Sequence, residues 1–282
     1  MGASLLITLR EGLEISLVLS ILLSYMIKTG RREETRAVWL GAGLAGVLCL
    51  VFGLIVHLTV NGLHGKSEMA VEGSIALIAS VVLTYMIFWM RSNARNISGE
   101  LHAQIDNSTT VFALAAIAFV AVAREGFETA LFLISAEANS ASGVSVVTGG
   151  LIGLVIAAVV GVYVFRFGHR IDLKKFFTYT GTLLILFAAG LAGKAVHEFR
   201  ELLGFESGFL VEPAFTIKSG PLQGGTTYDF LKGLFGWASN PERIRVITYF
   251  GYLIPVMYAF LGMTKKNALP SAAAVSEATA SV

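Results

Sequence analysis

The sequence contains seven apolar stretches, each about as long as a helix that crosses a lipid bilayer. A bilayer core about 30 Å thick needs roughly 20 apolar residues per spanning helix. The stretches cover residues 3–27, 37–60, 70–90, 110–134, 144–167, 176–196 and 244–263. They do not show the strict alternation, in segments of about ten residues, that is typical of membrane β-barrels. We therefore expect an all-α integral membrane protein with seven transmembrane helices.

Composition agrees with this fold class. Of the 282 residues, 55% are hydrophobic and only 14% are charged. A soluble domain of this length cannot keep so much apolar surface away from water. The first stretch is expected to be a retained helix and not a cleaved signal, because no Lys or Arg precedes Arg10 and charges interrupt the apolar run. Cys49, the one cysteine, excludes an internal disulfide and a thiolate metal cage.

The distribution of Lys and Arg over the short loops predicts the orientation in the membrane. Basic residues follow the first, third, fifth and seventh stretches, within 28–36, 91–95, 166–175 and 265–266. Lys66 stands alone between the second and third stretches. In the cell (inner) membrane, the N-terminus should therefore lie outside and the C-terminus in the cytoplasm.

A five-residue motif, Arg-Glu-Gly-x-Glu, occurs in the first stretch and again in the fourth. The segments LREGLEISLVLS (9–20) and AREGFETALFLI (123–134) match at six of twelve positions without a gap. Because the copies are three helices apart, they cross the membrane in opposite directions. We therefore predict an inverted repeat of helices 1–3 and 4–6, with helix 7 appended. Transporters of this kind bind substrate at the repeat interface, near the midplane of the bilayer.

The repeat also sets the predicted domain organisation. Residues 1–266 should form a single transmembrane permease domain, with repeat one at about 1–92 and repeat two at about 108–201. An outer loop at 202–243 precedes the seventh helix at 244–263. Residues 267–282, rich in Ala and Ser, should form a disordered cytoplasmic tail.

The motif places charged side chains inside apolar helices, where each costs roughly 2.5–3.5 kcal/mol to insert at the helix centre. At 100° per residue, the charges of each copy share one helix face. They are Arg10, Glu11 and Glu14 in the first copy, and Arg124, Glu125 and Glu128 in the second. Each Arg can neutralise the Glu four residues on, which is the purely structural explanation. Four carboxylates and two guanidinium groups, however, leave a net charge near −2, which suits a multivalent cation.

Carboxylate oxygens favour hard cations. The spacing alone does not choose among iron, manganese, calcium and magnesium.

The paired motifs closely resemble those of the oxidase-dependent iron permease family, which includes fungal high-affinity iron permeases and bacterial ferrous-iron permeases. Other similar segments are LTYMIFWMR at 83–91, AAGLAGKAVHEFRE at 188–201 and GLFGW at 233–237. The resemblance extends to about Lys266. It implies that iron is transported through Glu11, Glu14, Glu125 and Glu128. It also implies a partner outside the cytoplasm, an iron oxidase or an iron-binding protein.

Acidic residues near the outer ends of the third and sixth stretches suggest where a cation enters. We predict that Glu72 and Glu201 belong to an acidic entrance, since local negative potential concentrates cations. The other polar side chains at these ends are Glu68, Glu198 and His197. The alternative is that all of them are ordinary solvated groups at helix ends. Three apolar side chains of the third stretch are expected to face lipid or the membrane interface: Met86, Trp89 and Met90.

Together with the family resemblance, which alone implies iron, the observations predict an iron permease that imports iron across the cytoplasmic membrane, and not an enzyme. Iron is the transported substrate, with no resident cofactor, and Arg10 and Arg124 would compensate the carboxylates. Membrane lipid is an expected partner and nucleic acid is not. Two alternatives stay open, namely a permease for another divalent cation such as lead or manganese, and a membrane di-iron carboxylate enzyme. The second is disfavoured because neither motif contains the His that usually completes such a centre.

Overall fold

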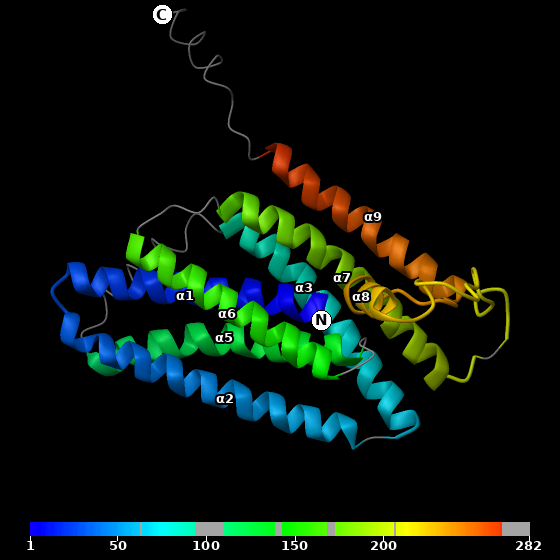
Figure 1. The fold of residues 1–282 in the computed structure, drawn as a ribbon, viewed down its shortest axis with the longest axis horizontal. Helices are drawn as coiled ribbons and strands as arrows, with labels where there is room; N and C mark the ends of the chain where they lie inside the picture. The colour runs from blue at the N-terminus through cyan, green and yellow to red at the C-terminus, as the bar shows by residue number, and fades with distance from the viewer. Residues whose placement is uncertain (63, 94–109, 139–142, 168–172, 206, 267–282) are drawn as a thin grey trace, which may run out of the picture.

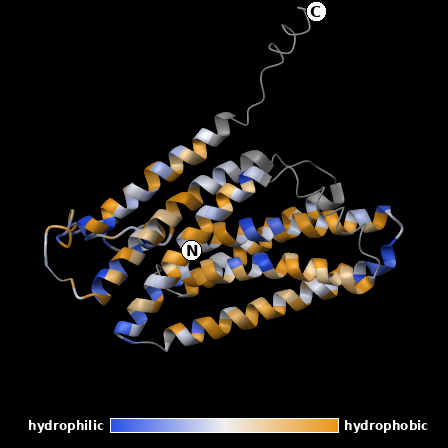
Figure 2. Ribbon diagram, turned by 180° about the vertical axis from the view of Figure 1, so that it is seen from behind, coloured by the Kyte–Doolittle hydropathy of each residue, from blue (hydrophilic) through white to orange (hydrophobic). Residues whose placement is uncertain are grey.

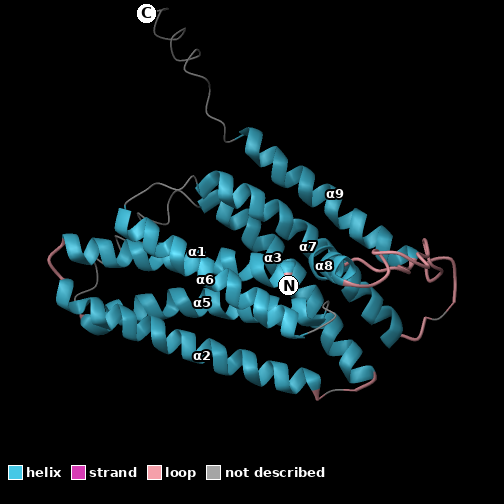
Figure 3. Cartoon of the chain, viewed as in Figure 1, coloured by secondary structure: helices cyan, strands magenta, loops and turns pink. Residues whose placement is uncertain are grey.

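The computed structural model describes the chain apart from residues 63, 94–109, 139–142, 168–172, 206 and 267–282. Its long helices are α1 (Gly2–Lys28), α2 (Thr35–Asn61), α3 (Lys66–Asn93), α5 (Val111–Ala138), α6 (Gly143–Phe167), α7 (Leu173–Leu202) and α9 (Arg243–Lys266). A short helix, α8 (Thr226–Phe235), precedes α9. Figure 3 shows only helices and loops in the described residues. The predicted all-α class is confirmed, and the predicted tail lies outside the described residues.

The long helices coincide with the predicted apolar stretches. Within the part of the chain that the structure describes, five helices are long and apolar enough to cross a membrane. They cover 32–60, 66–92, 143–163, 178–202 and 243–262. The remaining two long helices, α1 and α5, have 27 and 28 residues and carry the charged motifs. The chain is thus a multi-pass membrane protein, while the number of seven spans stays a prediction.

The helices form two groups. In Figure 1, α1, α2, α5 and α6 run alongside one another, and α3, α7 and α9 form a second, inclined group. The main pairings are α1 with α6, α2 with α5 and α3 with α7, and α9 packs on α7. The helices that carry the motifs, α1 and α5, also contact each other directly.

Glycines make the close pairings of the first group possible. A Cβ atom at Gly153 of α6 would overlap Thr8 Oγ1 and the carbonyl oxygen of Leu5 in α1. A Cβ atom at Gly41 of α2 would overlap the carbonyl oxygen of Ala115 in α5. Small residues of this kind let membrane helices approach until their backbones are in contact.

The main core lies between the two groups, and the outward faces are apolar too. Phe132, Phe187 and Phe260 are buried together in that core. On α2, by contrast, Leu50 is 75% exposed, and Figure 2 shows apolar residues along the outside of this helix. Lipid rather than water is the solvent that suits such a surface.

The segment between α7 and α9 folds back onto the bundle. Leu234 of α8 is buried in the main core, and Gly236 ends the helix with a φ of 66°. A Cβ atom at Gly190 of α7 would lie 2.8 Å from the backbone nitrogen of Gly236. Two glycines are therefore needed where the end of α8 meets α7, since one must adopt positive φ and both backbones touch.

Candidate metal site

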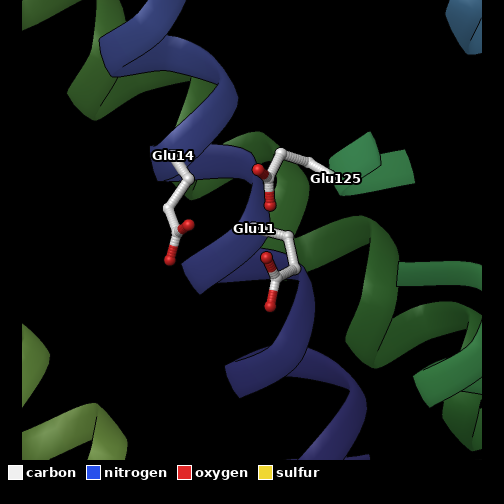
Figure 4. Close-up of side chains that lie close together, drawn as sticks. All are labelled: Glu11, Glu14 and Glu125. Carbon is white, nitrogen blue, oxygen red and sulfur yellow. The ribbon is translucent and has the colours of Figure 1, made fainter. Parts of the chain in front are cut away.

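Three carboxylates from the two motifs lie together between α1 and α5. Glu11 and Glu14 come from α1 and Glu125 comes from α5 (Figure 4). Each offers one oxygen, and these oxygens lie within 4.8 Å of one another. Carboxylate oxygens coordinate divalent cations at about 2.0–2.6 Å, so a group of this size can hold one ion. The helices thus bring together three of the four predicted motif glutamates.

These carboxylates are buried and only partly paired. Glu11 is 1% exposed and Glu125 is 8% exposed. Among the described residues, Glu11 Oε2 and Glu125 Oε2 have no hydrogen-bond partner. Leaving a buried acceptor unsatisfied costs about 1–3 kcal/mol, and more when it is charged. A bound cation would remove this cost, which is the physical reason to regard the group as a metal site.

Arg10 is the fixed counter-charge of the α1 carboxylates. Its side chain is 2% exposed. Its Nε lies 3.3 Å from Glu14 Oε1, and its Nη1 lies 3.5 Å from Glu11 Oε1. The same Nη1 lies 3.6 Å from the sulfur of Met86 in α3. One guanidinium therefore reaches both motif carboxylates of its own helix.

Arg124, the equivalent residue of the second motif, has different surroundings. Its side chain is 44% exposed. Its Nε lies 3.3 Å from Glu128 Oε1 and 3.8 Å from Glu125 Oε1. Its Cζ lies 4.6 Å from the centroid of the Trp89 ring in α3. Glu128 is thus held by Arg124 and is not one of the three converging carboxylates.

The glycine of each motif faces a neighbouring helix. A Cβ atom at Gly12 would lie 2.7 Å from the Cβ of Ala157 in α6. A Cβ atom at Gly126 would lie 2.5 Å from the sulfur of Cys49 in α2. Both copies of the motif therefore need glycine at this position. Each motif helix carries its carboxylates on one face and packs closely against a neighbouring helix with another face.

The two predicted entrance residues are each paired with basic groups and do not belong to the group of converging carboxylates. Glu72 Oε2 of α3 lies 2.6 Å from the Nζ of Lys194 in α7. Glu201 Oε1 lies 3.1 Å from Arg200 Nη2 and 3.7 Å from His197 Nε2. A role of Glu72 and Glu201 in cation entry stays a prediction.

Sequence reasoning missed Lys194, which is 8% exposed and also lies 3.8 Å from Glu198 Oε1. The signal was present, because this lysine falls inside the apolar stretch 176–196, and an ionisable residue there marks a functional or paired position.

The prediction for the end of α3 was wrong. Met86 and Met90 are 2% and 5% exposed and belong to the main core, and Trp89 is partly buried against it. The reason is that α7 covers this face of α3 while the motif arginines approach the same face. A helix that is apolar all round gives no periodic signal for which side is covered.

Comparison with known proteins gives a consistent result. The model of the family described as "Iron permease FTR1 family" matches residues 1–265. The chain is similar to the ferrous iron permease EfeU of Yersinia pestis, with 37% identity over 260 residues, which is 90% of this chain and 91% of the relative. The relative of the same name from Escherichia coli (strain CFT073) is 35% identical over 261 residues, covering 91% and 94% of the two chains. No solved structure matches.

Proposed function

The chain belongs to the iron permease FTR1 family, and we propose that it imports iron across the cytoplasmic membrane through a midplane site built from its two Arg-Glu-Gly-x-Glu motifs. The observation that carries the proposal is the buried group of three carboxylates contributed by both motifs. Oxygen ligands suit a hard cation. The named relatives are ferrous iron permeases, which supports iron as the cargo.

The packing supports an inverted repeat with seven spans. In such a repeat, α1, α2 and α3 correspond to α5, α6 and α7. When each helix is replaced by its counterpart, the α1–α6 pairing becomes the α5–α2 pairing, which the structure also contains. The same replacement leaves α3–α7 and α1–α5 unchanged. The contacts of the motif glycines agree with the same correspondence, since Gly12 packs on α6 and Gly126 packs on α2. At 1.5 Å per residue, α1 and α5 are each about 40 Å long, which is enough to span a bilayer.

In this proposal the N-terminus lies outside and the C-terminus in the cytoplasm. Glu72 and Glu201 would then lie on the outer side, where an arriving cation competes with Lys194 and Arg200 for their carboxylates. The ion would pass to the buried group and then to the cytoplasm. An iron oxidase or iron-binding protein outside the membrane would supply it.

Of the two alternatives, the di-iron enzyme is not retained, because the relatives are permeases. Transport of another divalent cation differs from the proposal in a measurable way. Unlabelled lead or manganese would then compete with radioactive iron for uptake at least as well as unlabelled iron does.

The proposal is tested by uptake of radioactive iron into vesicles that contain the purified protein. Glu14→Gln and Glu125→Gln remove one charge each from the carboxylate group and are expected to lower uptake more than tenfold. The matched control is Glu34→Gln, because Glu34 pairs with Arg31 between α1 and α2, at 2.7 Å. All three variants should elute from a sizing column like the unmodified protein. Normal uptake by both Glu14→Gln and Glu125→Gln would refute the motif site.

A further inference from the structure

We propose that Arg124 is the counter-charge that moves away from Glu125 when iron binds, while it stays paired with Glu128, and that the ring of Trp89 holds its guanidinium there. Trp89 is then a positioning residue for transport, on a helix that carries neither motif. The inference rests on the proposed function of the motif site.

The two arginines differ in how firmly they are held. Arg10 is 2% exposed and contacts Glu11, Glu14 and Met86. Arg124 is 44% exposed, and its nearest carboxylate contacts are to Glu128 and Glu125 at 3.3 and 3.8 Å. A buried side chain with three contacts cannot turn away without leaving charges unpaired. The half-exposed arginine is the one with room to move.

Trp89 offers the place to move to. Its ring centroid lies 4.6 Å from the Cζ of Arg124, so the guanidinium is in contact with the ring and with the carboxylates of Glu128 and Glu125. A cation bound beside Glu125 repels the guanidinium and competes for the same carboxylate. The face of an indole ring attracts a guanidinium even away from water, and tryptophan does so better than phenylalanine. The ring therefore lowers the free energy that metal binding must supply to displace Arg124 from Glu125.

The placement of both arginines depends on one face of α3. Met86 and Trp89 are three residues apart and so lie on the same side of the helix. Met86 contacts Arg10 and Trp89 contacts Arg124. This face of α3 thus contacts both counter-charges: Arg10, which keeps its position when iron binds, and Arg124, which moves.

The test compares the iron concentration at half-maximal uptake (KM) and the maximal rate in Trp89→Leu, Trp89→Phe and a control. In Trp89→Leu, Arg124 has no ring to move to, and KM is expected to rise roughly two- to thirtyfold. Trp89→Phe should give a smaller rise. The maximal rate per folded protein should change less than twofold in both. The control is Phe88→Leu, because the Phe88 ring packs edge-on against Phe260 and its KM should stay unchanged.

A double variant makes the test independent of general damage to α3. With Arg124→Gln already present, Trp89→Leu should cause no further change in KM, since the group that the ring receives is gone. Should Trp89→Leu not fold, the comparison is made with Trp89→Phe. An unchanged KM in the single variants would overturn the inference, and so would an equal rise in KM with and without Arg124. The proposed function fails separately, if the unmodified protein does not take up iron or if Glu14→Gln and Glu125→Gln both take it up normally.

Discussion

Replacing Gly126 by alanine is expected to disturb both the stability of the bundle and the metal site. The new Cβ would lie 2.5 Å from the sulfur of Cys49 and 3.0 Å from its Cβ. Non-bonded carbon atoms prefer about 3.5–4.0 Å, so roughly 1 Å of overlap must be relieved by turning the Cys49 thiol and by moving α5 away from α2. Overpacking of this size costs about 1–3 kcal/mol. Because Glu125 precedes Gly126, the shift also changes the carboxylate group.

Two measurements test Gly126→Ala. The melting temperature of the detergent-solubilised protein should fall by roughly 2–12 °C, at about 2–4 °C per kcal/mol for a chain of this size. Iron uptake by vesicles should fall as well. Gly46→Ala is the matched control, because Gly46 lies on α2 with nothing within 4 Å of its Cβ position. It should leave both quantities close to those of the unmodified protein.

A second substitution tests whether the contact itself is the cause. Cys49→Gly removes both atoms that the new Cβ would meet, and in the Gly126→Ala background it should restore melting temperature and uptake in part. Cys49→Ala should restore less, because its Cβ stays at 3.0 Å. The reasoning is refuted if Gly126→Ala behaves like Gly46→Ala, or if Cys49→Gly restores nothing.

Further predictions concern the charged groups and the α1–α6 contact. Arg10→Gln should lower the melting temperature much more than Arg124→Gln, because it leaves buried carboxylates without a counter-charge, at about 3–5 kcal/mol; equal melting temperatures would contradict this. Lys194→Met should also lower the melting temperature, because it leaves Glu72 without its partner. Adding Glu72→Leu to Lys194→Met should restore much of the lost melting temperature. A double variant that melts no higher than Lys194→Met would refute this prediction. Gly153→Leu should abolish the monodisperse peak on a sizing column, and a normal peak would argue against the close α1–α6 contact.

Much of the fold could be predicted because the signals are local. The length of an apolar stretch predicts a helix of similar length, and every predicted stretch, apart from Thr110 at the start of the fourth, lies in a long helix of the structure. The motif could be found because charges are conspicuous in apolar helices. Its face could be assigned because i, i+1 and i+4 positions share a side of any helix. Glu11, Glu14 and Glu125 follow from these rules and from the repeat.

The partners of the motif could not be predicted in the same way. Which side chains meet Arg10 and Arg124 depends on how α3 crosses α1 and α5, and an apolar helix in lipid carries no periodic pattern that reveals this. Met86 and Trp89 were therefore assigned to the membrane surface. Lys194 is a different case, since its position in an apolar stretch was visible in the sequence.

The unequal surroundings of the two motifs also bear on the charge of the cargo. With all groups ionised, Glu11, Glu14, Glu125 and Arg10 sum to −3 + 1 = −2, whereas Arg124 and Glu128 form a neutral pair at 3.3 Å. A divalent ion neutralises that charge, whereas a trivalent ion leaves an excess positive charge in a buried site, which is costly. We therefore expect iron kept ferrous by a reductant to be taken up faster than ferric iron at the same free concentration. Faster uptake of ferric iron would show that the Arg124–Glu128 pair opens and that Glu128 joins the site.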